Sequence, residues 1–140
     1  MAGEKVVIHL RDKSLKKGYL KTLDEDAEVV EIERTDGLMQ GFHFDDIKAV
    51  FFVKDFEGKR FYREKKVFES RPQAELRRVY IRFYDKEGLW GYIQGPLPWE
   101  KGFYLDGKKK KGVIVYPTDP NSNNEKIYVV LSSVEDLVLA

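Results

Sequence analysis

The chain has 140 residues, enough for one ordinary domain or two very small ones, and its 25 lysines and arginines nearly balance its 24 aspartates and glutamates. This net charge of +1 argues against attachment to nucleic acid or acidic membranes by overall charge. The absence of cysteine excludes disulfides, thiolate metal sites and cysteine nucleophiles. No apolar run reaches the roughly 20 residues of a membrane helix, and no signal-peptide stretch opens the chain, so we expect a cytoplasmic protein. Lysine and glutamate dominate while glutamine, methionine and cysteine are scarce, a composition that high growth temperature favours.

The first third of the chain predicts a series of short strands. Val6, Ile8 and Leu10 alternate with Val7, His9 and Arg11, which is the period-2 pattern of a half-buried strand. After a turn, a second strand over residues 15–23 contains Gly18, where a glycine usually marks a sharp bend. Three more strands follow, at residues 28–33, 39–44 and 47–53. Five bent strands within about 50 residues favour a small barrel, which closes its own edges.

The second half of the chain repeats the first. Residues 5–13 reappear as residues 78–86, and the match continues to Gly91-Tyr92 at a constant offset of 73. The ends of the two units correspond at an offset of 87, so the second unit has about 14 extra residues between 95 and 126. The sequence therefore predicts an all-β protein of tandem duplicated small five-stranded barrels. The predicted parts are a first barrel at 1–54, a connector at 55–76 and a second barrel with an inserted hairpin and loop at 77–140.

The polar segments predict connections. The connector lacks a long apolar period, and we expect one strand in it around residues 61–68. In the second unit, the run Lys108 to Lys111 between two glycines predicts a solvated hairpin tip, with RNA or an acidic partner as the alternative. Three adjacent carboxylates at residues 24–26 can hold a hard cation, but such turns usually face water.

The spacing around the first turn of each unit resembles that of Sm-like barrels. Leu10 precedes a turn and Gly18 bends the next strand eight residues later, and the second unit repeats this with Phe83 and Gly91. Where that family has a turn glycine, this chain has Lys13 and Lys86. The second Sm signature, an apolar-Arg-Gly turn that builds the RNA pocket, is missing. The resemblance therefore implies the Sm-like fold without its RNA pocket.

A second resemblance covers nearly the whole chain. Residues 45–58, 116–124 and 127–130 are similar to an uncharacterised bacterial domain family whose members often occur near or fused to PilZ-type cyclic-di-GMP receivers. This resemblance implies a place in cyclic-di-GMP signalling. Direct binding of the nucleotide is not expected, because the PilZ motifs are missed by one residue: Gly18 follows Asp12 one position too late, and Arg60 and Arg63 are one position too close.

One strand face alternates basic and aromatic residues. Its outward positions are Arg78, Tyr80, Arg82 and Tyr84. Such a face can hold phosphates while its rings stack on bases. The alternative, which we favour, is a solvated strand face with cross-strand pairs worth a few tenths of a kcal/mol each.

The segment from Pro117 to Asn124 predicts an ordered loop. Prolines fix φ, and carboxylate and amide side chains can hydrogen-bond nearby backbone amides, at Asp119, Asn121, Asn123 and Asn124. We expect this loop to form part of a partner-binding surface, because ordered loops on rigid scaffolds often carry function. Trp90 aligns with Lys17 and therefore with a solvated face. We expect the junction between the units to cover it. The alternatives are a local register shift that turns Leu89 or Trp90 inward, and a bound partner that covers Trp90.

The sequence predicts no enzyme, no cofactor and no metal. The two histidines, His9 and His43, lack a recognisable nucleophile or acid partner, and no phosphate-cradling glycine loop is present. We expect a non-catalytic interaction or regulatory module that acts through a protein partner. The alternative is an Sm-like RNA-binding protein, whose salt-dependent binding of single-stranded RNA would use the face from Arg78 to Tyr84.

Overall fold

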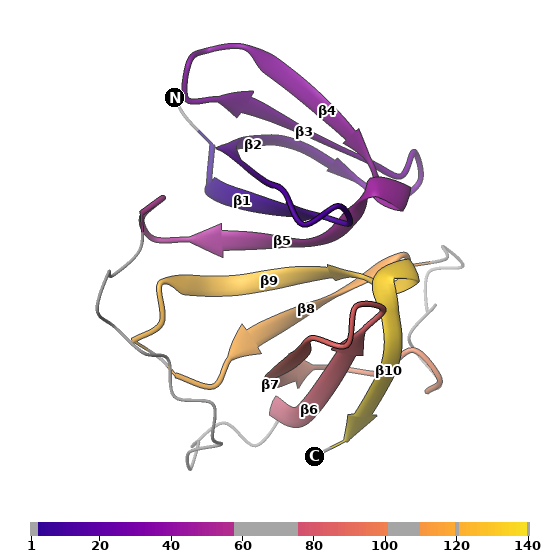
Figure 1. Ribbon diagram of the computed structural model, residues 1–140. Coiled ribbons are helices and arrows are strands. Elements are labelled where there is room, and N and C mark those ends of the chain that lie inside the picture. The colour runs from indigo at the N-terminus through magenta and orange to yellow at the C-terminus, as the bar shows by residue number, and fades with distance from the viewer. Residues whose placement is uncertain (1–2, 58–75, 101–109, 120, 140) are drawn as a thin grey trace.

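The computed structural model describes residues 3–57, 76–100, 110–119 and 121–139, which form ten strands and two short 3-10 helices (Figure 1). The first half contains β1 (Lys5–Leu10), β2 (Leu15–Asp24), β3 (Val29–Arg34), β4 (Met39–His43), η1 (Phe44–Asp46) and β5 (Ile47–Val53). The second half contains β6 (Leu76–Phe83), β7 (Gly88–Gln94), β8 (Gly112–Pro117), β9 (Asn124–Val130), η2 (Leu131–Ser133) and β10 (Val134–Leu139). The predicted all-β class is confirmed.

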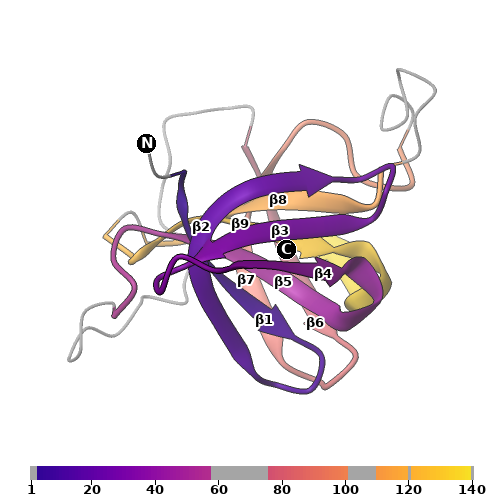
Figure 2. The same cartoon turned by 90° about the horizontal axis from the view of Figure 1, so that it is seen from above.

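All ten strands belong to one antiparallel sheet. Their order is β10-β6-β7-β8-β9-β5-β1-β2-β3-β4, so β5 and β9 pair directly and join the two halves (Figure 1). Seen from above, the first half lies over the second (Figure 2). The prediction of two separate five-stranded barrels is not confirmed, because the described strands form a single open sheet through the β5–β9 pair.

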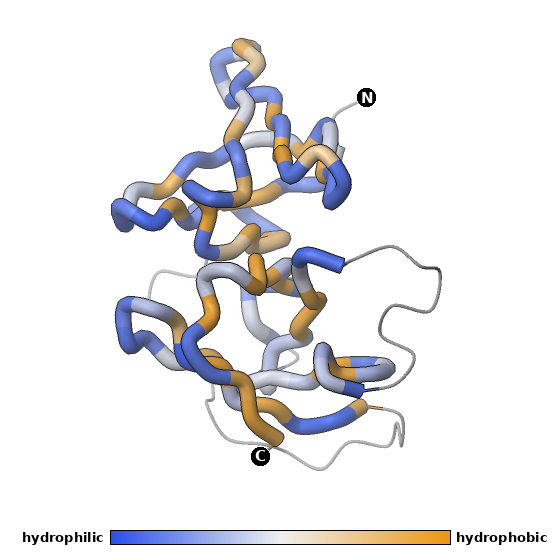
Figure 3. The backbone as a smooth tube through the Cα atoms, turned by 90° about the vertical axis from the view of Figure 1, so that its right-hand side faces the viewer, coloured by the Kyte–Doolittle hydropathy of each residue, from blue (hydrophilic) through white to orange (hydrophobic). Residues whose placement is uncertain are grey.

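The paired strands β5 and β9 separate two hydrophobic cores. Val50 of β5 and Tyr128 of β9 lie opposite each other and contribute to the core of the first half. Their neighbours Ala49 and Val129 also lie opposite each other but contribute to the core of the second half. Because successive side chains of a strand point to opposite faces, one pair of strands serves both cores. Elsewhere along the described backbone, short apolar and polar stretches alternate (Figure 3).

The first turn of each half has the same construction. Lys13 and Lys86 both have a φ of 73°, a left-handed conformation that favours glycine. Each turn is held by the carboxylate before it: Asp12 Oδ1 accepts from the amide of Ser14 at 2.9 Å, and Asp85 Oδ1 accepts from the amide of Glu87 at 3.1 Å. These bonds stabilise the turn locally, so lysine is tolerated where a turn usually has glycine.

The two strand glycines are required by close backbone approach. Gly18 pairs with Val6 and Gly91 pairs with Val79. A Cβ atom on Gly18 would lie 2.7 Å from the carbonyl oxygen of Glu33, and one on Gly91 would lie 2.6 Å from that of Tyr116. Any side chain at either position would therefore force the neighbouring strand away.

Several sequence predictions fall on residues that lie outside the described part of the chain. They are residues 58–75 of the connector with its predicted strand, residues 108 and 109 of the lysine-rich hairpin tip, and residue 120 of the predicted loop. Among the described residues, no helix has the length and apolar character needed to cross a membrane.

Candidate functional site

A groove of about 180 Å³ opens where the two halves meet. The first half contributes His9 from β1 and Lys48 and Phe51 from β5. The second half contributes the end of β6, the following turn, the start of β7, the residue after β8 and part of β9. The lining residues from this half are Phe83, Glu87, Gly88, Leu89, Trp90, Thr118, Asn124 and Ile127. We call this site the junction groove.

Aromatic rings from both halves line the junction groove. The His9 ring stacks on Phe51 with centroids 4.0 Å apart, and the Trp90 ring packs against Tyr80 with centroids 4.5 Å apart. Burial, together with the positive charge of Lys48, lowers the pKa of His9 to about 4, so the imidazole is neutral at pH 7. The sequence predicts that the junction covers Trp90, but the side chain remains 40% exposed, so this prediction is wrong.

A buried lysine joins the two halves beside this groove. Lys48 Nζ donates to Asp85 Oδ2 at 2.9 Å and to Glu87 Oε1 at 2.6 Å, and it lies 4.7 Å from the ring centroid of Phe83. Burial alone would lower the pKa of Lys48, but the hydrogen bonds to Glu87 and Asp85 outweigh it and raise the pKa above its usual value. Burial would likewise raise the pKa of Asp85, but the hydrogen bond from Lys48 holds this pKa below its usual value. Lys48 and Asp85 therefore both stay charged at neutral pH.

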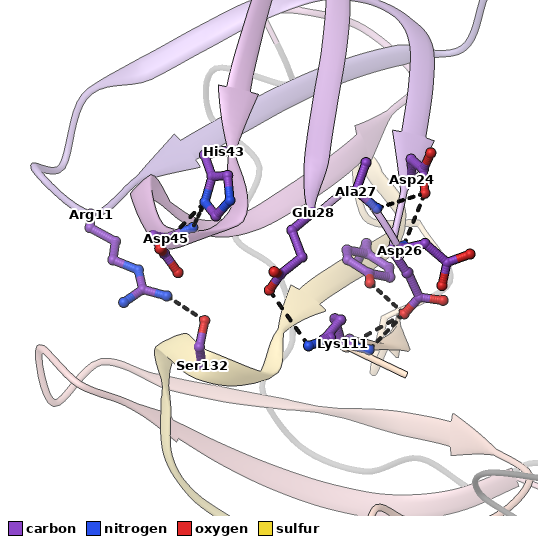
Figure 4. Close-up of polar contacts among 12 residues, drawn as sticks. Arg11, Asp24, Asp26, Ala27, Glu28, His43, Asp45, Lys111 and Ser132 are labelled. Atoms are coloured by element: carbon purple, nitrogen blue, oxygen red, sulfur yellow. Dashed lines mark hydrogen bonds and ion pairs between the residues drawn. The ribbon is translucent and has the colours of Figure 1, made fainter. Parts of the chain in front are cut away.

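Further polar contacts hold the halves together at the ends of β5 and β9 (Figure 4). Arg11 Nη2 donates to Ser132 Oγ at 2.6 Å. Glu25 Oε2 accepts from the Tyr128 hydroxyl at 2.8 Å and from the backbone amides of Lys111 and Gly112. The predicted acidic turn is therefore part of the contact between halves rather than a fully solvated cluster. Among the described residues, no group of histidine, aspartate or glutamate side chains is arranged to hold a metal ion.

The basic and aromatic strand face is partly engaged within the molecule. Arg82 Nη2 lies 3.6 Å from a Glu135 carboxylate oxygen and 4.0 Å from one of Asp136. The Tyr84 hydroxyl donates to the carbonyl oxygen of Arg11 in the other half. Tyr80 supports Trp90, and Arg78 is exposed on the same strand. Arg82, Tyr84 and Tyr80 of the predicted phosphate-binding face thus contribute to internal contacts.

The predicted loop is tied to the segment just after β5. Asn123 Oδ1 accepts from the amide of Asp55 at 3.0 Å, and Asn123 Nδ2 donates to the carbonyl of Asp55 at 2.8 Å. Asp119 is buried, and its Oδ1 accepts from the amide of Asn121 at 2.9 Å. Asn124 lines the junction groove. Of the predicted site residues, only Trp90 and Asn124 line the groove, and Tyr80 backs it.

The sequence reasoning missed the first-half wall of the groove. His9, Lys48 and Phe51 are far in sequence from Trp90, and no local pattern brings them together. One signal was available: Lys48 is a charged residue in the otherwise apolar strand β5. Charged residues are almost never buried unless they are paired, so this lysine indicates a carboxylate partner from elsewhere in the chain.

A comparison with protein families finds one match that covers both halves and the groove. Residues 2–140 match a family model described as a family of unknown function (DUF6982). No curated protein and no solved structure matches the chain. The family description assigns no activity, ligand or partner, so the role of the groove rests on its geometry.

Proposed function

The chain belongs to this family of unknown function, and from that premise we propose that it is a non-catalytic interaction module that binds a protein partner through the junction groove. The observation that carries this proposal is the open, ring-lined groove between the halves, with Trp90 at its rim. Tryptophan and tyrosine are enriched among the residues that dominate protein–protein binding energies.

The size of the groove favours a single side chain as its occupant. An apolar cavity of about 150 Å³ holds one benzene molecule, whereas pockets for larger ligands span roughly 300–1,000 Å³. At about 180 Å³, the junction groove accommodates one ring-sized group and is too small for a cyclic dinucleotide. A link to cyclic-di-GMP signalling, which rests on the sequence resemblance alone, would therefore run through a protein partner.

Hydrogen bonds and ring packing hold the groove residues Asn124 and Trp90 in position. Asn124 follows Asn123, whose side chain is bonded to the backbone at the end of β5. Trp90 packs on Tyr80, and Gly88 leaves room for the Tyr80 ring because a Cβ there would lie 2.6 Å from the hydroxyl oxygen. A preorganised surface binds more tightly, because less conformational freedom is lost on association.

We also propose that the two halves are duplicated Sm-like units. The strand order supports this proposal, because β5-β1-β2-β3-β4 in the first half corresponds to β10-β6-β7-β8-β9 in the second. The shared φ of Lys13 and Lys86 and the equally close strand approach at Gly18 and Gly91 support it further. On this view, the junction groove is a feature of the pair of units and of neither unit alone.

Partner capture tests the proposed function. The purified chain is immobilised and exposed to extract from its native cells, and the retained proteins are compared between wild type, Trp90→Ala and Trp99→Ala. Trp99 is a matched control, because it is 59% exposed and does not line the groove. We expect Trp90→Ala to lose a protein that wild type and Trp99→Ala both retain. Equal retention by all three proteins would exclude the groove as the binding site.

The alternative of RNA binding has its own readout. Single-stranded RNA that binds with a steep salt dependence, and that is released by Arg78→Ala but not by Trp99→Ala, would favour the strand face over the groove. We expect no such binding, because Arg82 and Tyr84 are engaged within the molecule.

A further inference from the structure

The cluster of Lys48, Asp85 and Glu87 carries one net negative charge, and two of its members, Lys48 and Glu87, line the junction groove. Lys48 is paired with two carboxylates, Asp85 and Glu87. The side chain of Asp85 is only 6% exposed, whereas that of Glu87 is 63% exposed and lines the groove. His9 adds no charge at neutral pH, since its pKa is about 4. An approaching group therefore meets an accessible carboxylate and no uncompensated cation.

The groove is also lined by aromatic residues, of which Trp90 is 40% exposed. Phe51, Phe83 and Trp90 all line it. One cation is already held in this way, since Lys48 Nζ lies 4.7 Å from the centroid of the Phe83 ring. A ring face attracts a cation through its electric quadrupole, and tryptophan is the strongest of the aromatic residues in this respect.

From these observations we infer that the occupant of the junction groove is an arginine side chain of the partner protein, with Glu87 as its counter-ion; this inference rests on the proposed function. A planar guanidinium stacks on aromatic rings and forks onto a carboxylate, which a lysine ammonium cannot do. The aliphatic stem of the arginine would pack on apolar side chains of the wall such as Leu89 and Ile127. A phosphate or carboxylate would instead be repelled by Glu87.

A small-molecule titration tests this inference without the partner. The full chain carries two tryptophans, so Trp99→Phe leaves Trp90 as the only indole reporter. This protein is titrated with N-acetyl-arginine-N-methylamide and with the uncharged, nearly isosteric citrulline analogue, and Trp90 fluorescence is followed. We expect a saturable change with the arginine compound and about tenfold weaker binding of the citrulline compound, because charge-assisted hydrogen bonds are roughly twice as strong as neutral ones.

A pair of variants tests whether the Glu87 carboxylate is the counter-ion of the bound arginine. In the same background, Glu87→Gln removes the charge but keeps an oxygen that accepts from Lys48, and we expect it to bind the arginine compound about tenfold more weakly. Glu31→Gln removes an exposed carboxylate of β3 outside the groove and should leave binding unchanged. Circular dichroism verifies the fold of both variants, and the citrulline comparison on the unaltered groove remains decisive if Glu87→Gln is unstable.

Three results would overturn the inference: equal binding of the two compounds, no saturable change with either, or unchanged binding after Glu87→Gln. The partner-capture experiment tests the proposed function independently of the arginine inference. Loss of the captured protein by Trp90→Ala, without any arginine preference, would leave the interaction module standing with a different occupant. Equal protein retention by Trp90→Ala and Trp99→Ala would remove the groove altogether.

Discussion

Burial beside Phe51 and Lys48 lowers the pKa of His9 from 6.5 to about 4, and this shift links protonation to stability. The unfolded chain binds a proton near pH 6.5, whereas the folded chain binds it only near pH 4. Between these values the unfolded state holds more protons, so the free energy of unfolding falls as the pH falls from 6.5 to 4. The effect is at most about 3 kcal/mol, at 1.36 kcal/mol for each pKa unit.

His9→Gln should flatten this part of the pH profile. Urea unfolding at several pH values from 7 to 4 measures the free energy of unfolding of both proteins. We expect the free energy of unfolding of the wild type to fall more than that of the variant over this range. Lys48 and Glu87, the charged groups that act on His9, are the same in both proteins. Parallel profiles would show that His9 is already accessible to protons in the folded state.

Lys48 should contribute strongly to the free energy of unfolding, because its carboxylate partners Asp85 and Glu87 lie in the other half. Lys48→Met leaves the buried Asp85 without a counter-charge, and such broken pairs cost about 3–5 kcal/mol. Adding Asp85→Asn removes the uncompensated charge and keeps an oxygen for the amide of Glu87, so we expect the double variant to recover part of the loss. Urea unfolding of the single and double variants tests this. No recovery would indicate that Lys48 stabilises the protein mainly by packing.

At the level of strands and loops, the Asn123 side chain continues the contact between β5 and β9 by hydrogen-bonding the backbone just after β5. Asn123→Ala removes two hydrogen bonds to the backbone of Asp55 and should cost about 1–2 kcal/mol of unfolding free energy. Asn121→Ala is the matched control, since the hydrogen bond of Asn121 to Asp119 uses the backbone amide. Equal stabilities of the two variants in thermal unfolding would mean that the loop is held by other contacts.

The strands show how far sequence patterns reach. The alternation at Val6, Ile8 and Leu10 identifies β1, and all three side chains are buried in the first core. The nearly continuous apolar run of β5 is typical of a strand buried on both faces. The local pattern nevertheless predicts β5 as the last strand of one barrel, because its pairing with β9 depends on residues about 75 positions away.

The candidate site was harder to predict than the strands. Trp90 and Asn124 were identified from their chemistry, but their partners across the groove were not. The exposure of Trp90 depends on how the two halves meet, and that geometry is fixed by long-range contacts such as Lys48 with Asp85. Local periodicity carries no information about such contacts.

At the scale of the whole molecule, the two halves should unfold together. The β5–β9 pair contributes to both cores. Arg11 and Lys48 tie the halves near the start of β5, and the Asn123 side chain ties them just after its end. We expect a single transition in urea, with coincident curves for circular dichroism and tryptophan fluorescence. Ile32→Ala, a cavity in the first core, should shift both curves equally although both tryptophans belong to the second half. Two separate transitions would show that the halves are independent domains.

The most direct test of the account is photo-crosslinking from within the junction groove in living native cells. Benzoylphenylalanine replaces Trp90 in one protein and the exposed Glu31 of β3 in the control. We predict that position 90 crosslinks to a discrete protein and position 31 does not, because only the groove is covered by the partner. Crosslinks from position 90 to RNA, or the same products from both positions, would contradict the claim that the groove is a protein-binding site.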